Sequence, residues 1–570
     1  MTFRRLAAGL SLLLSLSTAA AQFSVPINSL GLSGGSIESS SPGGPQVTQN
    51  ASSGLIQAQT PYGNSTALYE ANAGAYASRA AAVNTSLVTN DFQHPTNVTA
   101  TVPKSVPNIT VPPQSAIESG VGDPYDYGDV LGLSLLFYEA QRSGPAAGNR
   151  VPWRADAQMG EVSSTGAPLV GGYADAGDNL KLNFPAAFAA SMLAWGLSEF
   201  PQGYANAGET DNALSALRWF ADFFVRSHYA DRVFTAQCGD PGADHSTWIP
   251  IEQSVTPRPC YDVTPEAGGA DVLGAVSAAL AATSQVFSRN DTDYSNILLA
   301  HALDLYAFAK LDPTTKYSDS IPQAYVYPSS STNDDLAWAA CWLYIRTGQP
   351  TFLQDAVTYY TNLPGIATMF SWDDYGAGVA MLLSTLRQGG GDAQKVQQFL
   401  VSWVTGTDGV QYTPKGAAWA SQWGSQRYTA NAALIASVFA QRSQGNNTLA
   451  AGYACWARKQ IRLMLGDAGA SYVVGYGLDP PTQPHHRTAS CPGATPPCGF
   501  SYFNTPDPNP NVIAGALVGG PNLDGSLADN RSNYVNLEVA VDYNAAFTGV
   551  LAFLAGGGIQ NATSTADCGQ

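Results

Sequence analysis

The sequence predicts an all-α domain that runs from about residue 125 to about residue 556. Nine segments place apolar residues at the three- and four-residue steps of a helix, alanine and leucine dominate them, and long alternating runs of β-branched residues are rare. Long loops rich in glycine, proline and aromatic residues join the segments. This pattern indicates ten or more helices in a ring of antiparallel pairs. A solenoid of helical hairpins is the alternative, although no fixed-length repeat is visible.

The expected helices follow one another along the whole domain. In the second of them, the residues on one face follow at steps of four, four and three, and they are Phe184, Phe188, Met192 and Trp195. In the last, one face carries Val539, Tyr543, Phe547, Val550 and Leu554. We expect helices at residues 127–144, 183–200, 211–228, 272–287, 297–310, 336–348, 376–386, 429–443 and 537–556.

Composition and charge narrow the class of protein. The chain has 570 residues, 45% of them apolar, which is ample for a large core. Its formal charge is −17, its pI is near 4.6, and no cluster of lysine and arginine is visible. A nucleic-acid partner would require such a cluster. An acidic, sparsely charged surface fits a secreted protein with a neutral ligand, and we expect a monomer.

The N-terminal part differs from the domain. Residues 1–21 have two arginines, a short apolar core and a small-residue cleavage site, so we interpret them as a signal peptide and the protein as secreted. Residues 22–120 are rich in Ser, Thr, Asn, Pro and Gly, and we interpret them as a glycosylated extension, with a binding module as the alternative. Residues 561–570 form a polar tail. No run of about 20 apolar residues predicts a membrane span.

Because we expect secretion, the cysteines are candidates for disulfides and the Asn-x-Ser/Thr sequons are candidates for glycosylation. Cys238–Cys260 and Cys491–Cys498 are plausible local disulfides, and the odd count of seven leaves at least one cysteine without a partner in the chain. Cys341 and Cys455 lie in apolar helical stretches. Sequons lie at Asn50, Asn64, Asn84, Asn97, Asn108, Asn290, Asn446, Asn530 and Asn561.

The loop "GGYADAGDNLKLNFP", residues 171–185, places Asp175 and Asp178 just before an apolar helix. Aspartates in this position commonly cap a helix by accepting backbone N–H bonds. Asp178 or Asp175 could instead be a general base. The loop alone favours the capping role.

Three further loops combine polar and aromatic residues. In "QCGDPGADHSTWIP" we expect an ordinary loop, with Trp248 as a stacking surface rather than a metal site. His485 and Arg487 follow a proline-rich stretch and suit a neutral hydroxylated ligand. Glu538 is expected to open the last helix behind Tyr534, where partial desolvation would raise its pKa and let it act as an acid.

The chain has none of the common cofactor motifs that we sought. There is no phosphate-binding G-x-x-x-x-G-K-[ST] and no G-x-S-x-G elbow. Water, two carboxylates and aromatic platforms are what glycoside hydrolysis needs. The sequence therefore favours a glycosidase.

The motifs also resemble, in order, those of glycoside hydrolase family nine, the endoglucanase-type cellulases. The resemblance rests on "LLFYEAQRSG", "NRVPWRAD", "GGYADAGDNLKLNFP", "LAWAACWLYIRTG", "YTPKGAAWASQWGSQRYTANAA", "SYVVGYGLDPPTQPHHR" and "DNRSNYVNLEVAVDYNAAF". It implies an (α/α)6 barrel over residues 121–560. It also implies a secreted, inverting endo-β-1,4-glucanase that acts on cellulose or related β-glucans and requires no cofactor. An exo-acting or other β-glycan hydrolase and a non-catalytic cell-wall carbohydrate-binding protein are the alternatives.

The resemblance also assigns site residues. Asp178 is implied as the catalytic base, Asp175 as its partner in holding the water, and Glu538 as the general acid. Substrate binding is implied for His485, Arg487, Asp529, Tyr428, Trp423 and Tyr173. A structural calcium ion would involve Asp271 and Asp319. The chain departs from the family pattern at Tyr173, where tryptophan is usual, and at Asn179, where histidine is usual; it also departs at Asp479 and Leu527.

Overall fold

A computed structural model describes residue 115 and residues 123–254, 256–387, 389–443, 448–492 and 497–558. The signal peptide, nearly all of the extension and the tail that the sequence predicts lie outside these residues. The same holds for all the sequons except Asn290 and Asn530.

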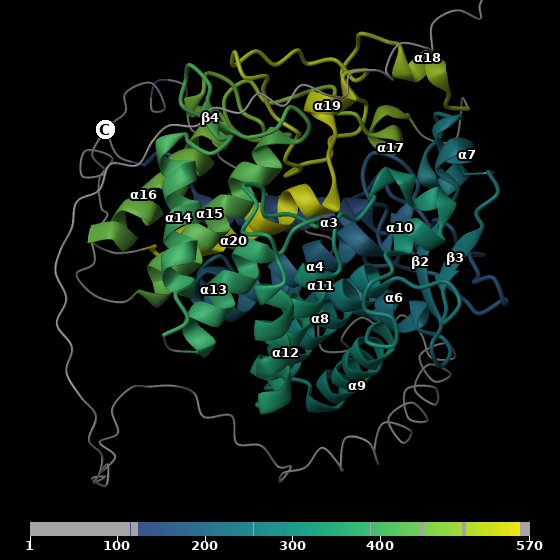
Figure 1. The fold of residues 1–570 in the computed structure, drawn as a ribbon. Coiled ribbons are helices and arrows are strands. Elements are labelled where there is room, and N and C mark those ends of the chain that lie inside the picture. Colours follow the sequence, from purple (N-terminus) through teal and green to yellow (C-terminus); the bar gives the residue numbers. More distant parts are fainter. Residues whose placement is uncertain are drawn as a thin grey trace, which may run out of the picture. The chain divides into compact units, whose positions relative to one another are not determined.

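In the described part of the chain, twelve long helices alternate between an inner and an outer ring (Figure 1). The inner helices contact one another in a closed cycle, because the last one packs against the first. In cyclic order they are α4 (Asn183–Glu199), α8 (Ala270–Phe287), α11 (Asn333–Thr347), α13 (Gly376–Leu386), α15 (Ser425–Arg442) and α20 (Val541–Ala555). The predicted (α/α)6 barrel is therefore confirmed, and the solenoid is excluded.

The outer helices each precede or follow an inner helix in the chain. They are α3 (Tyr127–Gln141), α6 (Thr210–Ser227), α9 (Thr292–Ala309), α12 (Pro350–Thr361), α14 (Asp392–Thr405) and α16 (Thr448–Arg462). Short helices lie in the loops: α5 (Pro201–Asn206), α7 (Pro241–His245), α10 (Tyr317–Ser320), α17 (Arg487–Ser490), α18 (Phe500–Phe503), α19 (Tyr534–Leu537), η1 (Ile251–Gln253), η2 (Pro322–Val326) and η3 (Leu463–Asp467).

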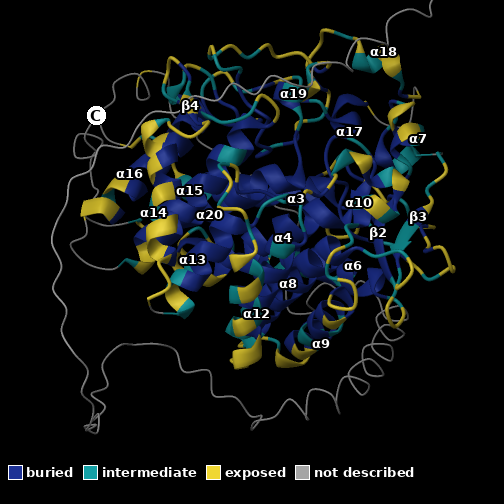
Figure 2. Cartoon of the chain, viewed as in Figure 1, coloured by how far each residue is buried: buried dark blue, intermediate teal, exposed yellow. Residues whose placement is uncertain are grey.

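The inner helix α20 and the outer helix α12 differ in burial, whereas the outer helix α3 is buried from Val130 to Gln141. The inner helix α20 is buried at every residue except its last, so it has no solvent face (Figure 2). The outer helix α12 buries only Phe352, Ala356 and Tyr360, one stripe at four-residue steps. Among the described helices, α8 alone is long and apolar enough to cross a membrane, but most of it is buried inside the barrel.

The nine predicted helices are present, with one shift. The last was expected to begin at Leu537, with Glu538 in its first turn. That prediction was wrong: Glu538 ends α19 in an extended conformation, and α20 begins at Val541. Three outer helices, α12, α14 and α16, were not among the predicted segments.

The few strands lie in loops. β1 (Lys181–Leu182), β2 (Phe234–Cys238) and β3 (Cys260–Val263) form an antiparallel sheet in that order, with Lys181 opposite Cys238 and Cys238 opposite Cys260. β4 (Gln411–Tyr412) pairs with β5 (Ala418–Trp419). The first sheet connects the predicted aspartate loop to the segment that carries α7.

Two predicted disulfides are confirmed, Cys238–Cys260 and Cys491–Cys498. Cys341 is a buried free thiol, whereas Cys455, expected only to be buried, is also disulfide-bonded.

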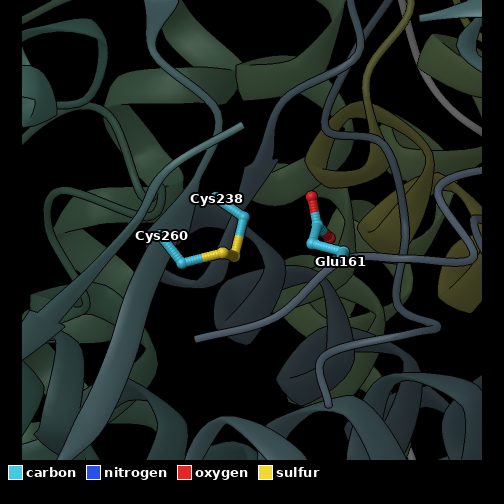
Figure 3. Close-up of side chains that lie close together, drawn as sticks. All are labelled: Glu161, Cys238 and Cys260. Carbon is cyan, nitrogen blue, oxygen red and sulfur yellow. A yellow bond between two sulfur atoms is a disulfide. The ribbon is translucent and has the colours of Figure 1, made fainter. Parts of the chain in front are cut away.

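Glu161 lies beside the Cys238–Cys260 disulfide (Figure 3). The two sulfurs are bonded to each other and the Glu161 carboxylate is paired with Lys181 and Arg258. These atoms are therefore already engaged, and they stabilise the sheet.

Candidate active site

The aspartate loop does not cap the following helix. The cap position of α4 is Leu182, and no side chain bonds to the first N–H groups of the helix. The turn is fixed by Gly177 instead, whose backbone oxygen accepts the Arg487 N–H at 2.9 Å. A Cβ on Gly177 would lie 2.0 Å from the backbone oxygen of His485. Glycine is needed here because two loops touch at this point.

Asp178 is held at both carboxylate oxygens. Oδ1 accepts the Leu180 N–H at 3.2 Å, and Oδ2 lies 3.0 Å from Nε2 of His245 on α7. Burial raises the pKa of this carboxyl, but the hydrogen bond with His245 and the charges of His245 and Arg487 outweigh it. The pKa of Asp178 therefore lies below its ordinary value. Asp178 is ionised near neutral pH.

Asp175 has the opposite character. It is 3% exposed, its Oδ2 accepts the Tyr327 hydroxyl at 2.7 Å, and its Oδ1 has no partner within the described chain. Burial and then the nearby charge of Asp178 raise the pKa of Asp175 well above its ordinary value. The charge of Asp178 thus disfavours ionisation of Asp175, and the two aspartates titrate as a pair.

Glu538 stands in an extended segment between α19 and α20. The Trp423 indole N–H donates to Oε2 at 2.9 Å, and the Tyr543 hydroxyl lies 3.4 Å from the same oxygen. Burial raises the pKa of Glu538 to about 7, against the lowering effect of the Trp423 hydrogen bond. The expected raised pKa is found, although Glu538 is not in the first turn of a helix.

Backbone bonds join the loops that carry the three carboxyls. The His485 N–H donates to the Leu537 oxygen at 2.8 Å, and the Val541 N–H donates to the Asp175 oxygen at 2.9 Å. Together with the Arg487–Gly177 bond, they fix three segments to one another. These are the aspartate loop (residues 171–185), the loop of His485 and Arg487 (the histidine loop) and the segment that carries Glu538 between α19 and α20 (the glutamate segment). The inner helices α4 and α20, which pack against each other, begin at the ends of the aspartate loop and the glutamate segment.

Two predicted ligand-binding residues lie in the histidine loop. His485 is partly exposed, and its Nδ1 lies 2.7 Å from the Arg531 oxygen; burial lowers the pKa of His485 to about 4. The ring is therefore neutral, Nδ1 carries the proton, and Nε2 is an acceptor. Arg487 is 4% exposed, and its Nη1 donates to Asp244 at 2.6 Å. Arg487 mainly orders the loops behind Asp178.

The remaining predicted binding residues differ in their surroundings. Trp423 is 46% exposed and packs against Tyr534, so it forms an aromatic wall beside Glu538. The Tyr428 hydroxyl accepts from Arg427, and Asp529 accepts the Thr482 and Gln483 N–H groups, which orders the histidine loop.

Tyr173 does not line a binding surface. It is 4% exposed, donates to the Ala216 oxygen and packs on Phe220, so the prediction of substrate contact was wrong. Asn179, a second departure from the family pattern, is also buried. Trp248, expected as a stacking surface, is 4% exposed and packs on His485.

The two predicted calcium residues already have partners within the protein. Asp271 is buried and accepts the Val272 and Tyr317 N–H groups, while Asp319 pairs with Lys316. The described residues bring potential metal ligands together at Asp178, Asp244 and His245 instead, but these groups already bond to one another or to Arg487. Calcium stays a prediction.

Sequence reasoning missed the partners of the carboxyls. His245 and Tyr327 were not predicted to contact the aspartates, because nothing in the sequence shows that residues 67 and 152 positions away meet them. Asn530, whose sequon we expect to be unoccupied or to direct its glycan away from the site, is exposed, and its side chain accepts from Ser532.

A closed double ring of helices that holds one carboxyl of lowered pKa and one of raised pKa on hydrogen-bonded loops is the arrangement that glycoside hydrolysis needs. The sequence model of glycosyl hydrolase family 9 matches residues 127–551, and the chain belongs to this family.

Similar proteins agree. The chain is 37% identical to "Endoglucanase 15" of Arabidopsis thaliana, over 75% of this chain and 94% of that protein. It is also 37% identical to "Endoglucanase 4" of Bacillus sp. (strain KSM-522), over 77% of this chain and 70% of that protein. The endoglucanase structure of the termite Nasutitermes takasagoensis matches with a TM-score of 0.73 and 42% identity, over 76% of this chain and all of that one. The predicted enzyme class, an endo-β-1,4-glucanase, is confirmed.

Proposed function

We propose that the protein hydrolyses internal β-1,4-glucosidic bonds of cellulose or a related β-glucan with inversion at the anomeric carbon. The observation that carries this proposal is the pair of carboxyls with separated pKa values, Asp178 below its ordinary value and Glu538 raised to about 7. Two titratable groups whose environments separate their pKa values in this way suit a base and an acid.

Asp178 acts as the base and Glu538 as the acid. Asp178 takes a proton from a water molecule whose oxygen attacks the anomeric carbon. Glu538 gives its proton to the glycosidic oxygen as the bond between that oxygen and the anomeric carbon breaks. The products are two sugar chain ends, and the enzyme is left with Asp178 protonated and Glu538 ionised, so one proton must return to Glu538 before the next turnover. An inverting enzyme needs a separation of roughly 6.5–9.5 Å between the two carboxyls, which leaves room for the water.

Other residues bind and orient. Asp175, held by Tyr327, shares the water with Asp178. The exposed face of Trp423 offers a stacking surface for a sugar ring, and Nε2 of His485 accepts a hydroxyl hydrogen bond. Cellobiose is bound in the structure of the cellulase Cel9M of C. cellulolyticum, which is 32% identical with a TM-score of 0.69, and this supports a β-glucan ligand.

Reducing-sugar release from carboxymethylcellulose tests the proposal. We expect Asp178→Asn and Glu538→Gln each to lose at least about 100-fold in kcat, the usual scale for removing a general acid or base. Proton NMR of the first products should show the α-anomer. Wild-type rates in both variants, or β-anomers first, would contradict the mechanism. A fall in viscosity that lags behind sugar release would indicate exo action, and binding to β-glucan without hydrolysis would indicate a carbohydrate-binding protein.

We also propose that the protein is secreted after cleavage behind Ala21. Its "RRLAAGLSLLLSLSTAAA" segment supports this. N-terminal sequencing of the protein recovered from culture medium should begin at Gln22, and a protein retained in the cell with Met1 intact would contradict it.

A further inference from the structure

A buried ion pair lies next to the acid Glu538. Arg427 on α15 donates through Nη1 to Oδ2 of Asp542 on α20 at 3.0 Å. The two side chains are 7% and 0% exposed, so water hardly reaches either charge. The pair joins two inner helices at the seam directly below the extended segment that carries Glu538.

One aromatic ring separates the arginine from the acid. The Arg427 guanidinium lies 4.9 Å from the centre of the Tyr543 ring, and the Tyr543 hydroxyl lies 3.4 Å from Oε2 of Glu538. Gly424 fits against the same ring, where a Cβ would lie 2.9 Å from the Tyr543 oxygen. This close fit brings the neighbouring Trp423 to its hydrogen bond with Glu538.

A lone cation at this distance would oppose the chemistry. A positive charge favours the ionised form of a nearby carboxyl, whereas a general acid must hold its proton until the bond breaks. The charge of Arg427 lowers the pKa of Glu538 and that of Asp542 raises it. The pair therefore presents a nearly neutral neighbour to the acid.

We propose that Asp542 is a positioning residue that cancels the charge of Arg427 and thereby keeps Glu538 protonated before the glycosidic bond breaks. The inference deepens the proposed function and rests on Glu538 being the acid. Other groups also face Glu538 and stay unchanged in the test; they are Asp175, Asp178, Tyr327, Trp423 and Tyr543.

The test compares pH profiles of kcat/KM on carboxymethylcellulose for the wild type, Asp542→Asn and the double variant Arg427→Gln/Asp542→Asn. In Asp542→Asn no negative charge balances that of Arg427, so the pKa of Glu538 should fall. The basic limb of the kcat/KM profile should then move down by about one pH unit, the low end of the shift that an opposite charge produces. In the double variant both charges are gone, and the basic limb should return to within about 0.3 of the wild-type position.

Asp392→Asn is the matched control, because it also removes a buried aspartate from an ion pair with an arginine, at 2.8 Å from the half-buried Arg387 and away from the site. It should leave the basic limb in place. A limb that does not move in Asp542→Asn, or that stays displaced in the double variant, would overturn the proposal. If Asp542→Asn does not fold, as judged by circular dichroism, the double variant decides alone: a basic limb displaced by one unit or more contradicts charge cancellation.

Failure of the acid assignment has a separate readout. If Glu538→Gln keeps wild-type activity, the proposed function fails together with this inference. If Glu538→Gln is inactive but the basic limb is the same in all the Asp542 variants, only the role of Asp542 fails.

Discussion

Replacing His245 tests the electrostatics of the base directly. His245 contributes the hydrogen bond, 3.0 Å long, that does most to lower the pKa of Asp178. His245→Ala should therefore raise the pKa of Asp178 and move the acidic limb of kcat/KM to higher pH. A hydrogen bond to a charged group is worth about 1.5–3 kcal/mol, but an exposed ion pair only about 0.2–1 kcal/mol. Because the His245 side chain is 47% exposed, we take about 1 kcal/mol, which corresponds to about 0.7 pH unit.

The assay is the pH dependence of kcat/KM on carboxymethylcellulose between pH 3 and pH 8. His245→Gln, whose amide can still donate but carries no charge, should show a smaller shift. Ser246→Ala changes an exposed neighbour that bonds only to the Ala243 oxygen, and it should leave the profile unchanged. An acidic limb that stays in place or moves to lower pH in His245→Ala would refute the reasoning.

Three further predictions concern stability. Glu538→Gln should raise Tm at pH 8 more than at pH 5. The reason is that a carboxyl whose pKa rises from 4.5 to about 7 on folding destabilises the folded state as pH increases through that window. Equal changes of Tm at both pH values would contradict this. Gly177→Ala should lower the free energy of unfolding by at least about 2 kcal/mol in denaturant titrations, because its Cβ would lie 2.0 Å from a backbone oxygen. Gly160→Ala is the control and should be tolerated, because no atom lies within 4 Å of its Cβ. Replacing Cys238 and Cys260 by serine should cost about 3 kcal/mol, the chain-entropy value for a separation of 22 residues, and an unchanged Tm would argue against it.

The sequence identified the inner ring better than the outer one. Helices such as α4 and α20 are apolar on all sides, so their alanine-rich runs stand out. α12 buries a single stripe of three residues among polar ones, and this weaker pattern was not predicted to be a helix.

The sequence predicted the carboxyls of the site but not the residues that contact them. Asp178 and Glu538 were found because their motifs resemble a known family. Their pKa values depend on burial and on two contacts, that of Asp178 with His245, 67 residues away, and that of Glu538 with Trp423, 115 residues away, and only the folded structure brings these residues together. Tyr173 was misassigned because a motif gives the order of residues but not the direction in which a side chain points.

The closure of the inner ring has a consequence for how the enzyme matures. The proposed base, Asp178, lies just before the first inner helix, α4, and the proposed acid, Glu538, just before the last, α20. The Val541–Asp175 bond joins the two segments. A ribosome must therefore release almost the entire chain before the two halves of the active centre can meet. During synthesis the polypeptide would carry no hydrolytic activity, and in a refolding experiment the return of turnover would report the final step of assembly.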